Sequence, residues 1–296
     1  MIRLAVRVAR AQAELVLAEL LELAPGGVEE VELGEHTEYA VYGAPGELPT
    51  LPALRAAAGD ALLEIDTREI PDDWEERWRE FHRPVVIAGA RPGPGSLRVR
   101  PPWEQPQSPS SELHEIVIDP GQAFGTGGHP TTRLCLELLL ALAAGERRRG
   151  TLLDVGTGSG VLAIAAALLG FAPVLALDND PMSLEAARSN ASQNGVEIQT
   201  IRFDLRAGPL PGATARPAPV AGRERTRGPV VVANLLRGLL LELADSLQYA
   251  PRELIASGLL RGEATEVAGA FAERLAMHER ERRASGEWEA LWLAAP

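Results

Sequence analysis

The stretch Leu152-Leu-Asp-Val-Gly156-Thr-Gly-Ser-Gly160-Val-Leu-Ala-Ile-Ala-Ala166 decides the fold. An apolar strand runs into a glycine-rich turn and then an alanine-rich helix, which is typical of a loop that binds a nucleotide-type cofactor. Glycine is needed there because the backbone bends sharply and a ligand approaches where a Cβ would stand. A dinucleotide fingerprint would place its third glycine at the position of Val161. The spacing therefore favours S-adenosylmethionine, which has no pyrophosphate to hold at a helix N-terminus.

A carboxylate ends the next expected strand. Asp178 lies 22 residues after Gly156, where an acceptor pair is placed to take both hydroxyls of a ribose. Asp180 comes just before Pro181 and is predicted to be the N-cap of the following helix. Asp178 is therefore the functional candidate of the two.

Residues 113–296 alternate between strand-like and helix-like sequence. This alternation predicts a doubly wound, Rossmann-like α/β sheet that is mostly parallel and covered on both faces. The segment 206–228 is dense in Pro, Gly, Ala and Arg, and is predicted to be a flexible surface insertion. The expected strands are 113–118, 151–155, 173–177, 229–233, 252–256 and 288–293.

Two further segments are expected at the same crevice, because ligands of open α/β sheets lie outside the carboxyl ends of the strands. Asn234 places a lone amide at the end of a buried strand. The glycine-rich segment 119–132 leads into a helix and carries His129. Taken alone, His129 is more typical of a packing residue at a helix start than of a catalyst.

The first part of the chain has a different pattern. Residues 1–70 follow the order βαββαβ, which predicts a small ferredoxin-like α+β domain. They hold five arginines and 13 carboxylates, a surface that suits a basic partner or simply aids solubility. Residues 71–112, which include Trp74, Trp78 and turns rich in proline and glycine, are expected to form a linker.

Composition narrows the function classes. The net charge of −12 disfavours a protein that grips a phosphate backbone, so no nucleic-acid partner is expected. The single cysteine, Cys135, allows neither an internal disulfide nor a cysteine zinc site, and no metal is expected. No apolar run approaches the roughly 20 residues of a membrane span, and no signal peptide is recognised. We expect a cytoplasmic monomer. All 29 basic residues are arginines, which genomic base bias explains.

The chain resembles the PrmA family of class I methyltransferases, which methylate amino groups of a large-subunit ribosomal stalk protein. The resemblance covers residues 113–296 well and residues 1–104 more weakly. Its motifs are Asp119-Pro-Gly-x-Ala-Phe-Gly-Thr-Gly-x-His-Pro-Thr-Thr132, Asp154-Val-Gly-Thr-Gly-Ser-Gly160, Asp178-x-Asp-Pro181, Asn190-Ala with Asn194-Gly195, Val232-Ala-Asn-Leu235, Ser257-Gly-Leu-Leu260 and Gly286-Glu-Trp288.

The resemblance implies a protein N-methyltransferase acting on lysine side chains or an N-terminal amine of the stalk protein, with residues 1–70 as the substrate-recognition domain. Asn234 and His129 are the implied catalytic candidates. Two positions depart from the family: Gly128 replaces a larger residue, and Arg237 stands where a small one is usual. The implied cofactor contacts are Phe124, Gly125, Thr132, Gly156, Gly158, Asp178, Asn234 and Leu235.

The implied reaction is an in-line displacement, in which a neutral amine attacks the methyl group of the sulfonium. A lysine amine with a pKa of about 10.4 must lose its proton first, and burial promotes that loss. The sequence shows no dedicated base, so positioning and desolvation are expected to supply the catalysis. Asn234 is expected to orient the amine, and His129 to accept a proton or shape its loop.

Three alternatives stay open at this point. The first is a methyltransferase of another amine-bearing protein or small molecule. The second is a nucleic-acid amino-methyltransferase, which the lack of an aromatic ring after Asn234 disfavours, because such enzymes stack a flipped base. The third is a binding module that keeps the fold as a scaffold, which the intact Gly156, Gly158, Asp178 and Asn234 disfavour.

Overall fold

The computed structural model describes residues 2–24, 28–43, 48–69, 82–88, 95–107, 113–120, 125–145, 149–211 and 228–295. The chain divides into two compact units, Met1–Phe81 and His82–Pro296. The predictions that concern Phe124, Trp74, Trp78 and residues 212–227 of the insertion lie outside the described residues. Among the described helices, none is both long and apolar enough to cross a bilayer.

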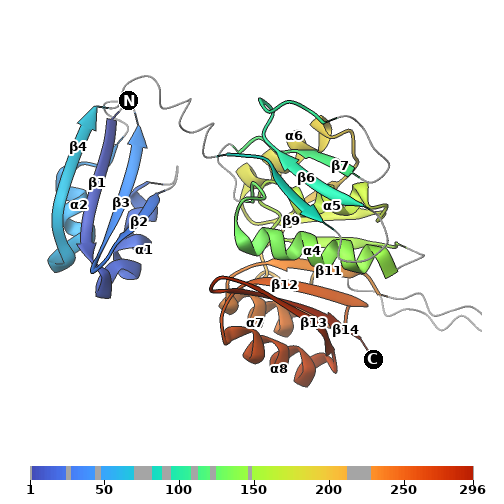
Figure 1. Cartoon of the computed structure of the whole chain (residues 1–296). Helices are drawn as coiled ribbons and strands as arrows, with labels where there is room; N and C mark the ends of the chain where they lie inside the picture. The colour runs from blue at the N-terminus through green and yellow to red at the C-terminus, as the bar shows by residue number, and fades with distance from the viewer. Residues whose placement is uncertain are drawn as a thin grey trace, which may run out of the picture. The chain divides into compact units, whose positions relative to one another are not determined.

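The described residues of the first unit form an antiparallel sheet with the strand order β2-β3-β1-β4, together with the helices α1 and α2 (Figure 1). The predicted ferredoxin-like βαββαβ order is confirmed. Its elements are β1 (Ile2–Ala9), α1 (Ala13–Leu23), β2 (Glu29–Leu33), β3 (His36–Gly43), α2 (Leu51–Ala58) and β4 (Leu62–Glu69).

Apolar and polar side chains partly alternate along β1, and this alternation explains how the sheet of the first unit packs. Leu4, Val6 and Val8 point to one face and pack in a core with Leu20 and Leu54 of the helices. Arg3 and Arg7 lie on the other face, where both bind the carboxylate of Glu38, at 2.6 and 2.8 Å. The side-chain period of two thus separates an apolar face from a charged face.

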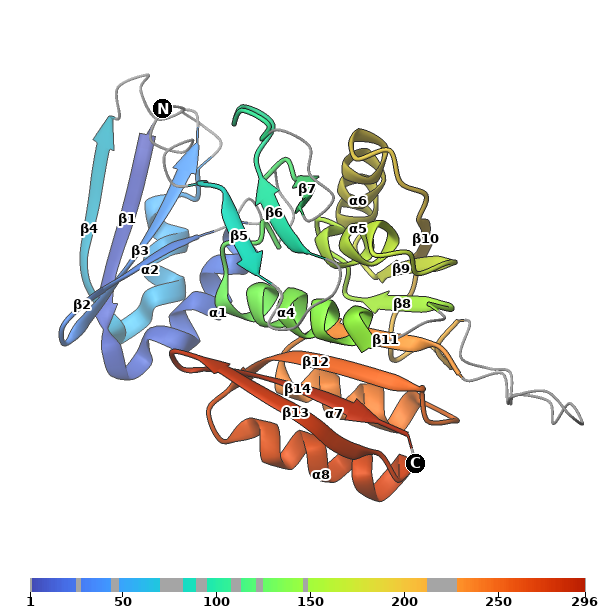
Figure 2. The same cartoon turned by 45° about the vertical axis from the view of Figure 1, so that its right-hand side comes forward.

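The second unit is built on a seven-stranded sheet with the order β10-β9-β8-β11-β12-β14-β13 (Figure 2). The first five strands pair in parallel, and β14 is antiparallel to both of its neighbours. The predicted Rossmann-like α/β class is confirmed. The strands are β8 (Leu152–Val155), β9 (Val174–Asp178), β10 (Gln199–Arg202), β11 (Val230–Asn234), β12 (Glu253–Leu260), β13 (His278–Ser285) and β14 (Trp288–Ala294).

The strand order reverses at β8. The chain moves outward from β8 to β9 and β10, and then returns to β11 on the other side of β8. Helices α4, α5 and α6 pack on one face of the sheet and α7 and α8 on the other (Figure 1). Such a reversal opens a crevice at the carboxyl ends of β8 and β11. The helices are α4 (Pro130–Gly145), α5 (Val161–Leu168), α6 (Pro181–Gln193), α7 (Arg237–Ser246) and α8 (Glu263–Leu275).

A separate three-stranded sheet, β5 (Val85–Ala88), β6 (Ser96–Arg100) and β7 (Leu113–Val117), completes this unit. Its apolar side chains join the core around α4 and α5. Glu115 of β7 binds Arg98 and Arg100 of β6, an arrangement that ties the two strands together. The chain has no lysine, so arginine is the long basic side chain of its ion pairs, as in the pairs of Arg3, Arg100, Arg237 and Arg283.

Several strands differ from the prediction. Residues 113–118 were expected in the main sheet, but β7 pairs in parallel with β6 instead. Strands β10 and β13 were not predicted, because Gln199-Thr-Ile-Arg is short and His278-Glu-Arg-Glu-Arg-Arg is charged. Both lie at edges of the sheet, where no continuous apolar run is required. The strands β5 and β6 lie within 71–112, and the linker itself stays a prediction.

Candidate functional site

The glycine turn after β8 forms the floor of the crevice. Gly156, Gly158 and Gly160 have φ values of +76°, +52° and +83°, which glycine adopts readily. A Cβ on Gly156 would stand 2.5 Å from Cδ2 of Leu235, so the leucine side chain would have to move to admit it. A Cβ on Gly160 would stand 3.0 Å from Cα of Ala187, so α6 packs directly on the turn. The turn is thus shaped by close packing on two sides.

Asp154 ties the turn to the start of α5 from below. Its fully buried carboxylate accepts hydrogen bonds from Thr157 Oγ1 at 2.7 Å and from the amide of Ala163 at 3.1 Å. Burial raises the pKa of this carboxyl from 3.8 to about 7, because the charged form loses its hydration. Asp154 therefore supports the turn from the protein interior.

The raised pKa of Asp154 predicts a pH dependence of stability. Between about pH 4 and pH 7 the unfolded carboxyl is ionised while the folded one keeps its proton, so the unfolded state binds fewer protons. The free energy of unfolding should therefore fall as pH rises through this window, by on the order of 3–4 kcal/mol. Asp154→Asn keeps an acceptor for Thr157 and has no proton to lose.

The measurement is urea unfolding of the parent chain and Asp154→Asn at pH 5 and at pH 8. The parent should lose more stability between these two values than the variant loses. Other carboxyls contribute equally to both proteins, so the difference reports Asp154. An identical loss in both proteins would contradict the prediction.

Asp178 ends β9 beside the glycine turn. Its Oδ2 accepts from the amide of Gly158 at 3.0 Å, and its Oδ1 accepts from the amide of Asp180 at 3.0 Å. Each oxygen of a carboxylate has a second lone pair, so both remain able to accept a hydrogen bond from a ligand. Asp180 caps α6 through the amides of Met182 and Ser183, as predicted.

Asn234 and Leu235 follow β11 on the other side of the crevice. The Nδ2 atom of Asn234 donates to Oγ1 of Thr132 at 3.4 Å, which links β11 to the first turn of α4. Leu235 lies over Gly156, and its amide donates to the carbonyl of Ser257 at 3.0 Å. These contacts bring together residues that are about a hundred positions apart in sequence.

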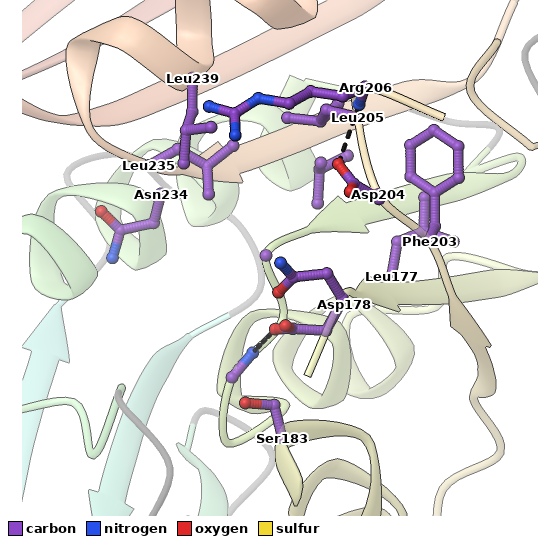
Figure 3. A pocket seen from close by; sticks show the side chains of 14 residues that line it. Leu177, Asp178, Ser183, Phe203, Asp204, Leu205, Arg206, Asn234, Leu235 and Leu239 are labelled. Atoms are coloured by element: carbon purple, nitrogen blue, oxygen red, sulfur yellow. Dashed lines mark hydrogen bonds between the residues drawn. The ribbon is translucent and has the colours of Figure 1, made fainter. Parts of the chain in front are cut away.

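These elements surround a cavity of about 320 Å³ (Figure 3). Five of the predicted site residues line it: Gly156, Gly158, Asp178, Asn234 and Leu235. The remaining lining residues are Val155, Leu177, Asn179, Ser183, Phe203, Asp204, Leu205, Arg206 and Leu239.

The other predicted residues that the structure describes, Gly125, His129 and Thr132, are not among the lining residues. Thr132 is fully buried and contacts Asn234, and the carbonyl of Gly125 accepts from Ser159 Oγ at 2.7 Å. His129 does not line the cavity. Its Nδ1 lies 2.8 Å from Thr131 Oγ1, and its ring meets Trp288 edge to face at a centroid distance of 5.1 Å. Burial lowers the pKa of His129, which favours a neutral imidazole at pH 7.

The residues that follow β10 were missed. Phe203, Asp204, Leu205 and Arg206 line the cavity and come directly after this strand. A short apolar and acidic run at the end of a strand is a signal for this edge of the sheet. The sequence prediction could not use it, because β10 itself was not recognised.

The two departures from the family pattern are accommodated locally. Arg237 begins α7, and its guanidinium binds Glu263 at 3.5 Å and Glu266 at 2.8 Å, both on α8. A Cβ on Gly128 would meet only Thr126 Oγ1, at 3.9 Å, so a larger residue would also fit there. Neither position lines the cavity.

The cavity suits an adenosine-type ligand without phosphates. Asp178 offers acceptors for a ribose diol, and Leu177, Phe203 and Leu205 offer apolar surface for a planar base. Among the described lining residues Arg206 is the one cation, and it binds Glu242 through two nitrogens at 3.0 and 3.1 Å. A phosphate would lack the free cations that usually bind it.

The comparisons with known proteins agree with this chemistry. The family model described as ribosomal protein L11 methyltransferase (PrmA) matches residues 53–295. The chain belongs to this family. The resemblance recognised from the motifs is therefore confirmed, and the chain is an enzyme that uses S-adenosylmethionine as methyl donor.

Two curated relatives carry the name ribosomal protein L11 methyltransferase. The one from Chloroflexus aurantiacus is 37% identical over 245 residues, which cover 78% of this chain and 71% of the relative. The one from Azotobacter vinelandii is 39% identical over 246 residues, covering 81% and 75%. A crystal structure of ribosomal protein L11 methylase from Lactobacillus delbrueckii subsp. bulgaricus matches with a TM-score of 0.54 and 29% identity, covering 71% of this chain and 97% of that one.

Proposed function

We propose that this methyltransferase transfers methyl groups from S-adenosylmethionine to amino groups of ribosomal protein L11, on lysine side chains or at the N-terminus. The observation that carries the proposal is the shared edge of the sheet at which Gly156, Asp178 and Asn234 surround one cavity. Membership of the family supports the acceptor, because the relatives are named for it.

The cavity is the proposed cofactor site. Asp178 accepts the ribose hydroxyls, and the glycine turn allows the backbone to approach the ligand. Phe203 and Leu205 face the adenine, with Asp204 as a polar partner for its amino group. Phe124, Gly125 and Thr132 are proposed as further contacts on the side of α4, as the family motif implies.

Catalysis is proposed to rest on positioning. The Nδ2 of Asn234 is engaged by Thr132, so Oδ1 is the atom proposed to accept a hydrogen bond from the incoming amine. A neutral His129 near the start of α4 is proposed to accept a proton, and its ring packs edge to face on Trp288. The bound cofactor supplies an activated methyl group, so the protein has to align the amine and exclude water.

The first unit is proposed to recognise the acceptor. Residues 1–70 hold 13 carboxylates and five arginines, which favours a basic protein surface. A cytoplasmic location, action as a monomer and the absence of a direct nucleic-acid contact belong to the same proposal. The linker between recognition and catalysis is proposed within residues 71–112.

The test is transfer of labelled methyl to purified ribosomal protein L11, beside a mixture of total ribosomal proteins. Label should appear on ribosomal protein L11 and should vanish with Asp178→Ala. Label on a different protein of the mixture would overturn the proposed acceptor while leaving the methyltransferase assignment intact. Label that persists with Asp178→Ala would overturn the proposed cofactor site.

A further inference from the structure

Asn190 of α6 and Asn194, the C-cap residue of this helix, hold other parts of the second unit through their side chains. Asn190 is 2% exposed, and Asn194 follows it one turn later, at the C-terminal end of the helix. Neither lines the cavity, and neither is used in the proposed catalysis. The two asparagines bind different segments of the unit and therefore position different parts of it.

Asn194 completes the edge of β7. Its Oδ1 accepts from the amide of Val117 at 2.8 Å, and its Nδ2 donates to the carbonyl of the same residue at 2.7 Å. The side-chain amide therefore pairs with the backbone as a neighbouring strand would. This contact stabilises the edge of the three-stranded sheet.

Asn190 connects the glycine turn to the segment that carries the family motif. Its Oδ1 accepts from the amide of Asp119 at 3.1 Å, and its Nδ2 donates to the carbonyl of Ser159 at 2.9 Å. The hydroxyl of Ser159, which is fully buried, donates to the carbonyl of Gly125 at 2.7 Å. Both Asp119 and Gly125 are thus tied, through one pair of side chains, to the glycine turn.

Helix α6 also packs directly against the glycine turn. Gly160 is so close to α6 that an added Cβ would touch Ala187, which lies three residues before Asn190. The helix, the glycine turn and the two residues Asp119 and Gly125 are therefore held against one another by packing and by buried hydrogen bonds. Removing one partner would leave buried donors and acceptors unpaired.

We infer that Asn190 and Ser159 are positioning residues for the cofactor site. They hold Asp119 and Gly125 against the glycine turn, so that α4 and Thr132 start from a defined place beside Asn234. The inference rests on the proposed cofactor site and does not depend on which protein accepts the methyl group.

The test measures the dissociation constant of S-adenosylhomocysteine by calorimetry for Asn190→Ala, Ser159→Ala and the double variant. Each single variant should weaken binding about tenfold, and the double variant should be no more than about threefold weaker than the worse single, because both act on one segment. Hydrogen exchange of the backbone amides in residues 125–132 should be faster in both single variants than in the parent. Initial rates at saturating acceptor should show a raised KM for S-adenosylmethionine.

Asn194→Ala is the matched control, because it also removes side-chain hydrogen bonds at the same helix. It should lower the melting temperature and leave the dissociation constant within twofold of the parent value. Unchanged affinity in both Asn190→Ala and Ser159→Ala would overturn the inference. An equal loss of affinity in Asn194→Ala would do the same, because it would show a general effect of destabilising the unit.

Discussion

Asp178→Ala should weaken binding of S-adenosylhomocysteine by roughly 10²–10⁴-fold. The carboxylate at the end of β9 is proposed to accept both ribose hydroxyls, and hydrogen bonds to a charged group contribute about 1.5–3 kcal/mol each. The substitution also releases the amide of Gly158, which Asp178 holds at 3.0 Å. Methyl transfer should fall in parallel, measured at a cofactor concentration near the parent KM.

Two further variants make the result specific to Asp178. Asp178→Asn keeps one acceptor oxygen and should lose less affinity than the alanine variant. Asp180→Asn should bind nearly as well as the parent, because asparagine caps a helix as well as aspartate does. A dissociation constant for Asp178→Ala within threefold of the parent value would contradict the proposed contact between this carboxylate and the ribose.

Gly258→Ala should be severely destabilising, although it adds only one methyl group. Gly258 has a φ of +89°, and a Cβ there would stand 2.3 Å from the carbonyl oxygen of Leu235 and 2.8 Å from its carbon. Because these are backbone atoms, no side-chain rotation relieves the clash. We expect a loss of at least about 3 kcal/mol and a fall in the melting temperature of about 6–12 °C.

Gly262→Ala separates the clash from the backbone strain. Gly262 has a φ of +92° but no atom within 4 Å of an added Cβ, so alanine there should lose only about 1–2 kcal/mol. Gly258→Ala should in addition weaken binding of S-adenosylhomocysteine at least about tenfold, because Leu235 and Asn234 must shift. Equal melting temperatures for the two variants would contradict this explanation.

The predictable parts of the site are those that lie at the carboxyl end of a recognisable strand, as a glycine turn or as a polar side chain. The glycines from 156 to 160 follow an apolar strand, and Asp178 and Asn234 each end another. Parallel strands bring their carboxyl ends to one edge, so sequence position alone brings these side chains together. The two-part organisation was predicted from the βαββαβ order of residues 1–70 and from the turns rich in proline and glycine that follow them.

Other features depended on tertiary contacts that leave no local pattern. Strand β13 carries charges at most positions and is stable because β14 pairs with it, so no alternation marks it. Phe203 to Arg206 differ, because a short apolar and acidic run at a strand end does mark them. This signal could not be used, since β10 itself was not predicted. The partners of Asn190 lie 71 and 31 residues away, and no spacing rule relates them.

The absence of lysine from the chain affects how the methylated product is detected. Arginine supplies the cation where a lysine could serve: Glu115 is bound by Arg98 and Arg100, and Glu266 by Arg237. The proposed activity includes lysine amines, but the chain has no lysine among its 296 residues and so carries no such acceptor in its own side chains. Label that comigrates with the enzyme in a transfer assay therefore does not report lysine self-modification, and any lysine product belongs to the added substrate.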